Sequence, residues 1–235
     1  MRERVLVSAH RAPEFGLVDA FGLPADYVEF DVRRWPGGGY LISHDLPVAG
    51  SEILTYDELL ETLAGQDVGA HVDLKMRSPA GLYDALGSCY EVEVVRRCLE
   101  VVPADCVVVT TGSERAARAL RDWADLEAPE VLVGLSIGGD VRGHSPWRQV
   151  KVRLSELFPG ARLRRARADV VAAHYWLARL TVARWARRHG VRLLVWTVDD
   201  TRLLHHWLKP GRAWMVTTNR PDVAVAIQRQ EAAAS

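Results

Sequence analysis

The stretch Val191-Arg192-Leu193-Leu194-Val195-Trp196 is almost continuously apolar and is followed closely by Asp199 and Asp200. A strand of a parallel sheet that is buried on both faces has this composition. Either aspartate can cap a helix whose leucines and Trp207 share one face, and Pro210-Gly211 ends that helix. The stretch therefore predicts one β-strand followed by one α-helix, which is the unit from which α/β folds are built.

Seven other parts of the chain repeat this alternation. Their candidate strands lie at residues 4–9, 27–31, 70–74, 105–110, 131–135, 169–173 and 213–217. Amphipathic segments lie between them, and one begins at Thr55, which can form a capping box with Glu58. Eight such units in 235 residues predict a (β/α)₈ TIM barrel that spans residues 1–235 as a single domain. An open, doubly wound sheet is the alternative.

The composition limits the classes of partner. The chain has 30 basic and 30 acidic residues, and no long basic stripe is evident, so we do not expect nucleic acid as a partner. No apolar run is long enough for a secretory signal or a membrane span, which predicts a cytoplasmic protein without stable membrane insertion. The segment Gly138–Gly160 has the least regular pattern, and it predicts either a loop over the barrel mouth or a poorly patterned helix.

Polar residues gather where the candidate strands end. The strand ends carry His10-Arg11, Glu29 and Asp31, Asp73 and Lys75, Trp196-Thr197, and Thr218-Asn219. The active sites of (β/α)₈ barrels lie at the carboxyl ends of the strands. We therefore expect these side chains to meet at one rim of the barrel.

Three of these residues are candidate metal ligands. Glu29 and Asp31 are two positions apart and so face the same side of their strand, and Asp73 ends the next one. Carboxylates that point at one place repel each other unless a cation neutralises them, and ligand sets made only of oxygen suit Mg²⁺ or Ca²⁺. The alternative is a structural ion-pair cluster with Arg11, Arg33 or Lys75.

Two histidines are candidates for acid–base chemistry. His10 ends the first strand, and His44 follows the glycine turn Gly37–Gly39 and a short return strand over Tyr40–Ser43. This hairpin would carry His44 back over the rim, where one histidine can act as a general base and the other as a general acid. We expect His71 to be a hydrogen-bonded core residue, whereas His174 fits the barrel mouth or a structural role equally well.

In their order along the chain, these residues resemble the glycerophosphodiester phosphodiesterase family. The resemblance runs from His10-Arg11 through Glu29-x-Asp31, His44-Asp45 and Asp73-Leu74-Lys75 to Trp196-Thr197-Val198-Asp199 and Thr218-Asn219-Arg220-Pro221-Asp222. It implies a TIM barrel with a small inserted hairpin. It also implies metal ligation by Glu29, Asp31 and Asp73, acid–base catalysis by His10 and His44, phosphate binding by Arg11 and Lys75, and an apolar wall at Trp196.

The implied reaction is the metal-dependent hydrolysis of glycerophosphodiesters to an alcohol and glycerol phosphate, with one Mg²⁺ or Ca²⁺ ion as cofactor. Two alternatives remain: a lysophospholipase D-type enzyme of lipid metabolism, and a barrel that binds phosphodiesters without turnover. The lipid enzyme needs an apolar entrance, for which the candidates are Phe15, Phe21, Trp35 and Trp176.

Three features depart from the family pattern. The first loop is short and carries Glu14 at an uncertain alignment, Asp73 stands where Glu is usual, and Asn219 stands where Asp is usual. The shorter arm of Asp73 is expected to loosen the metal or change its preference. Asn219 is expected to remove an interaction behind the site.

Overall fold

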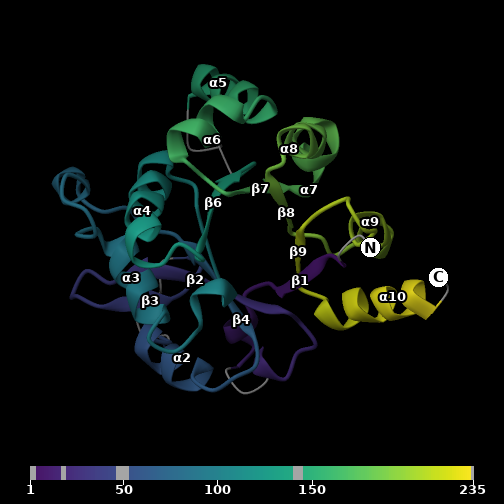
Figure 1. Ribbon diagram of the computed structural model, residues 1–235, viewed down its shortest axis with the longest axis horizontal. Coiled ribbons are helices and arrows are strands. Elements are labelled where there is room, and N and C mark those ends of the chain that lie inside the picture. The colour runs from purple at the N-terminus through teal and green to yellow at the C-terminus, as the bar shows by residue number, and fades with distance from the viewer. Residues whose placement is uncertain (1–3, 17–19, 46–52, 140–144, 234–235) are drawn as a thin grey trace.

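Eight parallel strands form a closed barrel in the computed structural model, which describes residues 4–16, 20–45, 53–139 and 145–233 (Figure 1). The barrel strands are β1 (Leu6–Ala9), β2 (Tyr27–Arg34), β4 (Gly69–Leu74), β5 (Val107–Thr111), β6 (Leu132–Ile137), β7 (Val170–His174), β8 (Arg192–Trp196) and β9 (Met215–Thr218). Each overlaps a segment that the sequence pattern predicted as a strand.

Strand β1 closes the barrel because it pairs on both sides. Leu6 is in register with Met215 of β9, and Ser8 is in register with Tyr27 of β2, both in parallel. The prediction of a (β/α)₈ barrel is therefore confirmed, and the open sheet is excluded.

A ninth strand, β3 (Tyr40–Ile42), runs antiparallel to the end of β2. Gly38 and Gly39 make the turn with φ angles of 100° and 77°, which side chains with a Cβ rarely adopt. The amide of Ser43 then donates to the carbonyl of Asp31 at 3.0 Å. The predicted return strand is confirmed, and this pairing fixes the start of the segment that carries His44.

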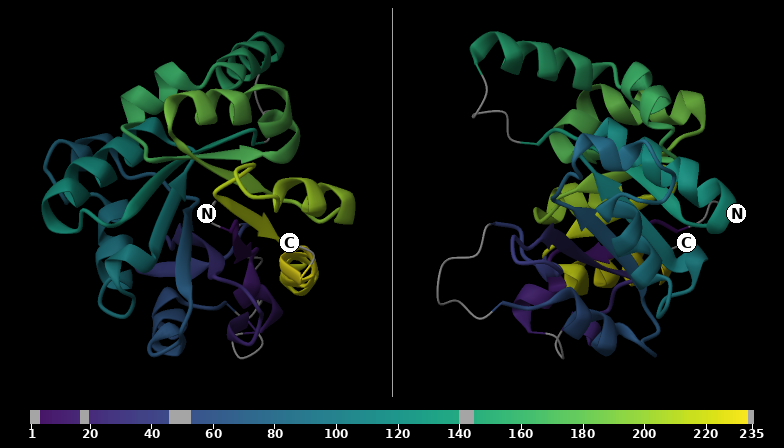
Figure 2. Two further views of the ribbon diagram at one scale, coloured as in Figure 1. Left: turned by 45° about the vertical axis from the view of Figure 1, so that its right-hand side comes forward. Right: turned by 90° about the vertical axis from the view of Figure 1, so that its left-hand side faces the viewer.

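Helices surround the barrel on the outside (Figure 2). The longer ones are α2 (Tyr56–Leu63), α3 (Tyr90–Cys98), α4 (Glu114–Glu127), α5 (Pro146–Leu157), α6 (Gly160–Ala166), α8 (Ala183–His189), α9 (Thr201–Trp207) and α10 (Pro221–Ala233). Short helical turns are η1 (Ala12–Phe15), η2 (Ala80–Tyr83), η3 (Ala104–Cys106), α7 (Tyr175–Leu177) and the π-helical η4 (Ala178–Val182). None of the helices in the described part of the chain is long and apolar enough to cross a bilayer.

The helix caps follow local sequence rules. The Thr55 side chain accepts from the amide of Glu58, whose carboxylate accepts from the amide of Thr55, so the predicted capping box is present. Asp200 caps α9 by accepting from the amides of Arg202 and Leu203. Asp199 is therefore free to serve the adjacent rim.

Side chains fill the barrel interior near the amino ends of the strands. Tyr27, Val108, Val170, Ala172, Leu194 and Met215 form a buried cluster inside the strands. Tyr27 fits because Gly69 on the neighbouring strand has no side chain: a Cβ there would lie 2.4 Å from the tyrosine ring. A second, larger cluster packs the outer face of the strands against the helices.

The segment Gly138–Gly160 is largely helical where the structure describes it. Helix α5 occupies Pro146–Leu157, so the alternative of a poorly patterned helix is correct for these residues. The expectation of a loop over the mouth falls mainly on residues 140–144, which lie outside the described residues.

Candidate active site

Three carboxylates converge at the carboxyl ends of β2 and β4. Asp31 is the register partner of Asp73, and Glu29 lies two pairs deeper, beside His71. One ligand oxygen from each of the three lies within 4.8 Å of the others. Glu29 and Asp31 are each only 2% exposed. The expected gathering of these three side chains is therefore what the fold produces, and the shorter arm of Asp73 still reaches the cluster.

Two cations balance this cluster incompletely. The Nζ atom of Lys75 lies 2.6 Å from Asp73 Oδ2 and 3.2 Å from Asp31 Oδ1, and Nε of Arg11 lies 3.2 Å from Asp31 Oδ2. Burial by itself lowers the pKa of Lys75, but the charges of Asp73 and Asp31 outweigh burial and raise it. Burial and the same two aspartates raise the pKa of the Glu29 carboxyl well above its ordinary value. Negative charge is therefore in excess.

Arg33 does not take part in this ion-pair cluster. Its guanidinium donates to the carbonyl oxygens of His44 and Lys75, so it joins the hairpin to the end of β4. Of the three cations in the structural alternative, Arg11 and Lys75 contact the carboxylates.

Carboxylate oxygens can bind a metal ion only if they have lone pairs that no other group uses. Both oxygens of Asp31 are buried and accept no hydrogen bond from any residue that the structure describes. Each oxygen has an ion-pair contact at 3.2 Å, with Lys75 or with Arg11, and keeps lone pairs that can coordinate a cation. The donor set is all oxygen, as Mg²⁺ and Ca²⁺ require. The residues present therefore fit a divalent cation.

His10 is held at the rim by the last strand. Its amide donates to the Thr218 carbonyl, and its Nδ1 lies 2.8 Å from Oδ1 of Asn219. The side-chain nitrogen Nδ2 of Asn219 donates to Asp199 Oδ2 at 2.6 Å, and an ionised carboxylate can only accept. Asn219 must therefore turn its oxygen toward His10, so Nδ1 of His10 carries the proton.

This arrangement corrects one expectation. Asn219 does not remove an interaction behind the site, because it links His10 to Asp199 through two hydrogen bonds. The Nε2 atom of His10 is left as the unprotonated nitrogen and lies 4.0 Å from Glu29 Oε2. Burial lowers the pKa of His10, which favours this neutral form.

Arg11 has a left-handed backbone conformation, and its backbone amide contacts Glu29. Its φ angle of 47° is left-handed, and its amide donates to Glu29 Oε2 at 2.7 Å. One residue therefore contributes its backbone to Glu29 and its guanidinium to Asp31. The Glu14 and Phe15 side chains nearby lie outside the described residues.

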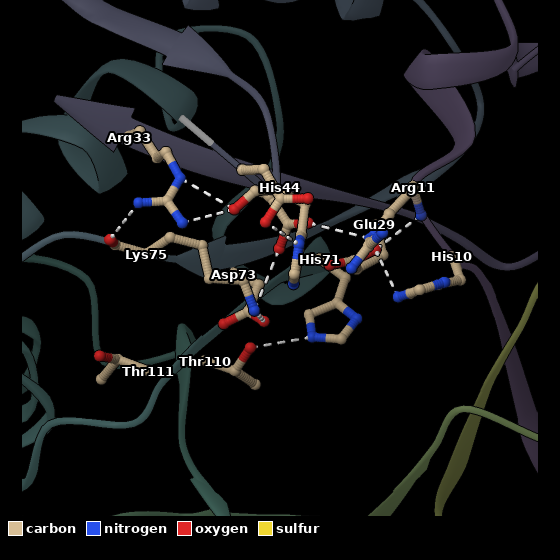
Figure 3. A network of polar contacts seen from close by, with 12 residues as sticks. His10, Arg11, Glu29, Arg33, His44, His71, Asp73, Lys75, Thr110 and Thr111 are labelled. Carbon is tan, nitrogen blue, oxygen red and sulfur yellow. Dashed lines mark hydrogen bonds and ion pairs between the residues drawn. The ribbon is translucent and has the colours of Figure 1, made fainter. Parts of the chain in front are cut away.

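His44 reaches the site from the hairpin. Its carbonyl is held by Arg33, and its Nδ1 lies 3.2 Å from Asp45 Oδ1. Figure 3 shows that His44 and His10 approach the carboxylates from different elements of the fold. The structure thus brings to one site the two histidines that lie 34 positions apart in the sequence.

A cavity of about 290 Å³ opens between these groups. Of the residues singled out by sequence, its walls include His10, Arg11, Glu29, His44, Asp73, Lys75 and Trp196. Asp31 lies behind the wall and contacts the cavity through Arg11 and Lys75. The Trp196 ring is held edge-on by His174 at a centroid distance of 5.3 Å.

The opposite wall contains residues that sequence reasoning missed. It consists of short side chains and glycines from β5 to β7 and the loops after them: Thr110, Gly112, Ser136, Gly139 and Ala172. Single hydroxyls within apolar strands carry no distinguishing signal, although the period of two on each strand could have placed them inside the barrel.

His71 forms the floor beneath the carboxylates. It is 3% exposed, and its ring nitrogens lie 3.1 Å from the hydroxyl of Ser8 and 3.2 Å from that of Thr110. Burial lowers its pKa to about 4. The expectation of a hydrogen-bonded core histidine is confirmed, and the residue also borders the cavity.

Comparisons with known proteins identify the fold. No family model matches the sequence, and no curated protein matches it. Solved structures do match. A glycerophosphodiester phosphodiesterase from Parabacteroides distasonis has a TM-score of 0.73 at 18% identity, with 99% of this chain and 100% of that chain covered.

Two further solved structures agree. A phosphodiesterase from Oleispira antarctica, in complex with the product sn-glycerol-3-phosphate, has a TM-score of 0.66 at 18% identity, covering 96% of this chain and 97% of its own. A glycerophosphodiester phosphodiesterase from Agrobacterium tumefaciens has a TM-score of 0.64 at 18% identity, covering 94% and 99%. Over nearly its whole length, the chain has the fold of the glycerophosphodiester phosphodiesterases that it resembles in sequence.

Proposed function

We propose that the chain is a phosphoric diester hydrolase that converts glycerophosphodiesters into an alcohol and glycerol phosphate with the help of a divalent metal ion. The observation that carries the proposal is one cavity lined by two carboxylates of the acidic triad, two cations and two histidines, with the third carboxylate directly behind its wall. The likeness to the Oleispira antarctica phosphodiesterase, whose structure contains sn-glycerol-3-phosphate, supports the choice of substrate.

Glu29, Asp31 and Asp73 would hold one Mg²⁺ or Ca²⁺ ion. When bound, such an ion polarises the phosphoryl group and neutralises the charge that develops on its oxygens. The hydrogen bond from the Arg11 amide holds one Glu29 oxygen in a fixed orientation. This chain's own cations, Arg11 and Lys75, would bind the remaining phosphoryl oxygens, because both border the cavity beside the carboxylates.

The two histidines would move the protons. His10 presents an unprotonated Nε2, so we assign it as the base that takes the proton from the substrate hydroxyl next to the phosphate. The hydroxyl oxygen attacks phosphorus, and the bond to the alcohol breaks. His44 would donate a proton to the departing alkoxide. The cyclic phosphate then opens with water to give glycerol phosphate. Trp196 would provide an apolar surface for the substrate at the mouth.

The test measures the release of alcohol and of glycerol phosphate from a panel of glycerophosphodiesters and lysolipids. The reaction is run with Mg²⁺, with Ca²⁺ and with chelator, beside His10→Ala and His44→Ala variants. We expect metal-dependent turnover that both substitutions abolish. Turnover that survives chelation or either substitution would contradict the assigned roles, and binding without turnover on every substrate would leave a barrel that only binds phosphodiesters.

The lysolipid alternative receives less support from the cavity. Of its four candidate entrance residues, Phe21, Trp35 and Trp176 do not border the described cavity, and the Phe15 side chain lies outside the described residues. Water-soluble glycerophosphodiesters are therefore the first substrates to test. Cleavage of lysolipids alone would favour the alternative.

A further inference from the structure

Helix α5 turns a stripe of large apolar side chains toward solvent. Trp147, Leu154 and Phe158, which we call the α5 face, are 79%, 55% and 74% exposed. The spacing of seven residues places Trp147 and Leu154 on one side of the helix, and Phe158 follows its last residue. Helices at the surface of a globular protein normally turn such a stripe toward the core. Here Figure 2 shows that α5 extends away from the barrel.

Polar contacts of α5 attach it to the protein. The carboxylate of Glu156 is buried and accepts from the amide of Gly138 and from Arg153, each at 2.8 Å. The Arg153 guanidinium lies 5.7 Å from the ring centre of Trp176. These contacts fix the orientation of the helix, so the exposure of its apolar stripe follows from its attachment to the barrel.

Basic residues are concentrated in the same part of the chain. Between residues 146 and 192 the sequence has 12 arginines and lysines but only two acidic residues, whereas the remaining chain has 18 basic and 28 acidic residues. Several of these arginines are exposed and form no ion pair with any residue described by the structure: Arg164, Arg179, Arg184, Arg187 and Arg188. Arg162, Arg165 and Arg167 are instead paired with acidic residues of α4. The neutral total of the chain therefore conceals an excess of positive charge in this segment.

The α5 face also lies near the mouth of the barrel. Helix α5 follows β6, and η4, which contacts α5, follows β7, so both belong to connections that leave the carboxyl ends of the strands. Leu180 of η4 is 64% exposed and Trp176 is 37% exposed, which adds apolar surface beside α5. The cavity opens at the same ends of the strands.

We propose that the α5 face docks on a membrane surface that contains anionic lipids. Exposed Trp, Leu and Phe side chains enter the boundary between headgroups and acyl chains. The exposed Arg179 lies on η4, which contacts α5, and would attract negative headgroups. A second copy of the chain is a poorer occupant, because a twofold contact would place two positive regions against each other. Docking is a binding property, so it holds whether or not the proposed reaction is correct.

The test is cosedimentation of the full chain with vesicles of phosphatidylcholine alone or mixed with phosphatidylglycerol. We expect binding to the mixed vesicles that weakens with added salt, because salt screens the charge attraction. A Trp147→Ser/Leu154→Ser variant should bind at least about tenfold less, since each substitution removes a large apolar side chain from the lipid. The matched control is Leu126→Ser on α4, where a leucine is 71% exposed away from α5.

Three results would overturn the proposal: no binding of the parent chain to the mixed vesicles, equal binding of the double variant, or equal loss in the Leu126→Ser control. A dimer that the double variant dissolves, seen by light scattering without vesicle binding, would assign the face to self-association instead. Turnover of a water-soluble glycerophosphodiester should be the same in the parent and the double variant, which separates docking from chemistry.

Discussion

Replacing Asn219 by leucine isolates the hydrogen bond that orients His10. Leucine has nearly the same size as asparagine but neither accepts from His10 Nδ1 nor donates to Asp199. Asn219 is exposed and lies at the rim, so its loss leaves the packing of the barrel intact. The His10 ring, which is 18% exposed, would then have no fixed tautomer. Its Nε2 could carry the proton and would no longer act as a base.

The expected magnitude follows from the lost contact. A partly buried donor left without its acceptor costs about 1–3 kcal/mol. Because that cost falls on the form of His10 that reacts, kcat/KM should drop about 10- to 100-fold. The melting temperature should stay within about 2 °C of the parent, since surface substitutions seldom change stability by more than about 0.5 kcal/mol.

An exchange of two side chains provides the control. Asp199→Asn combined with Asn219→Asp keeps one carboxylate and one amide, and every hydrogen bond at the pair can form again. Asn219→Asp alone would place two carboxylates where 2.6 Å now separates an amide from a carboxylate. We therefore expect kcat/KM to be reduced in the single variant and largely restored in the double variant. Parent-like activity of Asn219→Leu would refute the orienting role, as would a double variant no better than Asn219→Leu.

Three further predictions concern the ion, the pH profile and the stability of the barrel. Asp31→Asn should weaken the binding of Mg²⁺ or Ca²⁺ at least about tenfold by calorimetry, because it removes a ligand charge, and unchanged affinity would contradict the assigned site. Burial lowers the pKa of His10 from 6.5, so His10 stays neutral in mildly acidic solution, and the acidic limb of kcat/KM should lie below pH 6.5; a midpoint above that value would show that His10 is not the base. Arg121 is 5% exposed and donates to Asp169, Asp125 and the Val131 carbonyl at 2.7 Å each, so Arg121→Met should lower the free energy of unfolding by about 3 kcal/mol in denaturant titrations, and a loss below about 1 kcal/mol would be inconsistent with a buried ion pair.

The fold was largely predictable because its signals are local. Continuous apolar runs such as Val191–Val195 identify strands with two buried faces, and capping residues such as Thr55 mark where helices begin. Closure of the barrel followed from the number of units rather than from any single residue. The packing inside the barrel was harder to predict. Tyr27 fits there because of Gly69, which lies 42 positions away in the sequence.

The candidate site could be predicted where polar residues lie two positions apart on one strand. Glu29 and Asp31, two residues apart, must share a face, and the same is true of Asp73 and Lys75. The sequence could not reveal that Asn219 would bind both His10 and Asp199, because the three lie in different connections. The totals of 30 basic and 30 acidic residues also conceal the excess of basic residues between 146 and 192, because they average over the whole chain.

The sum of the charges in the site explains why a bound cation would favour substrate binding. Three carboxylates face two cations, Arg11 and Lys75, so the cluster has one negative charge too many and would repel the phosphate of a diester. Burial raises the pKa of Glu29, and the charges of Asp31 and Asp73 raise it further. A divalent ion reverses the sign and leaves a single positive charge, which one diester anion neutralises. His10 adds no charge to this balance before the reaction, because burial lowers its pKa and so favours the neutral ring.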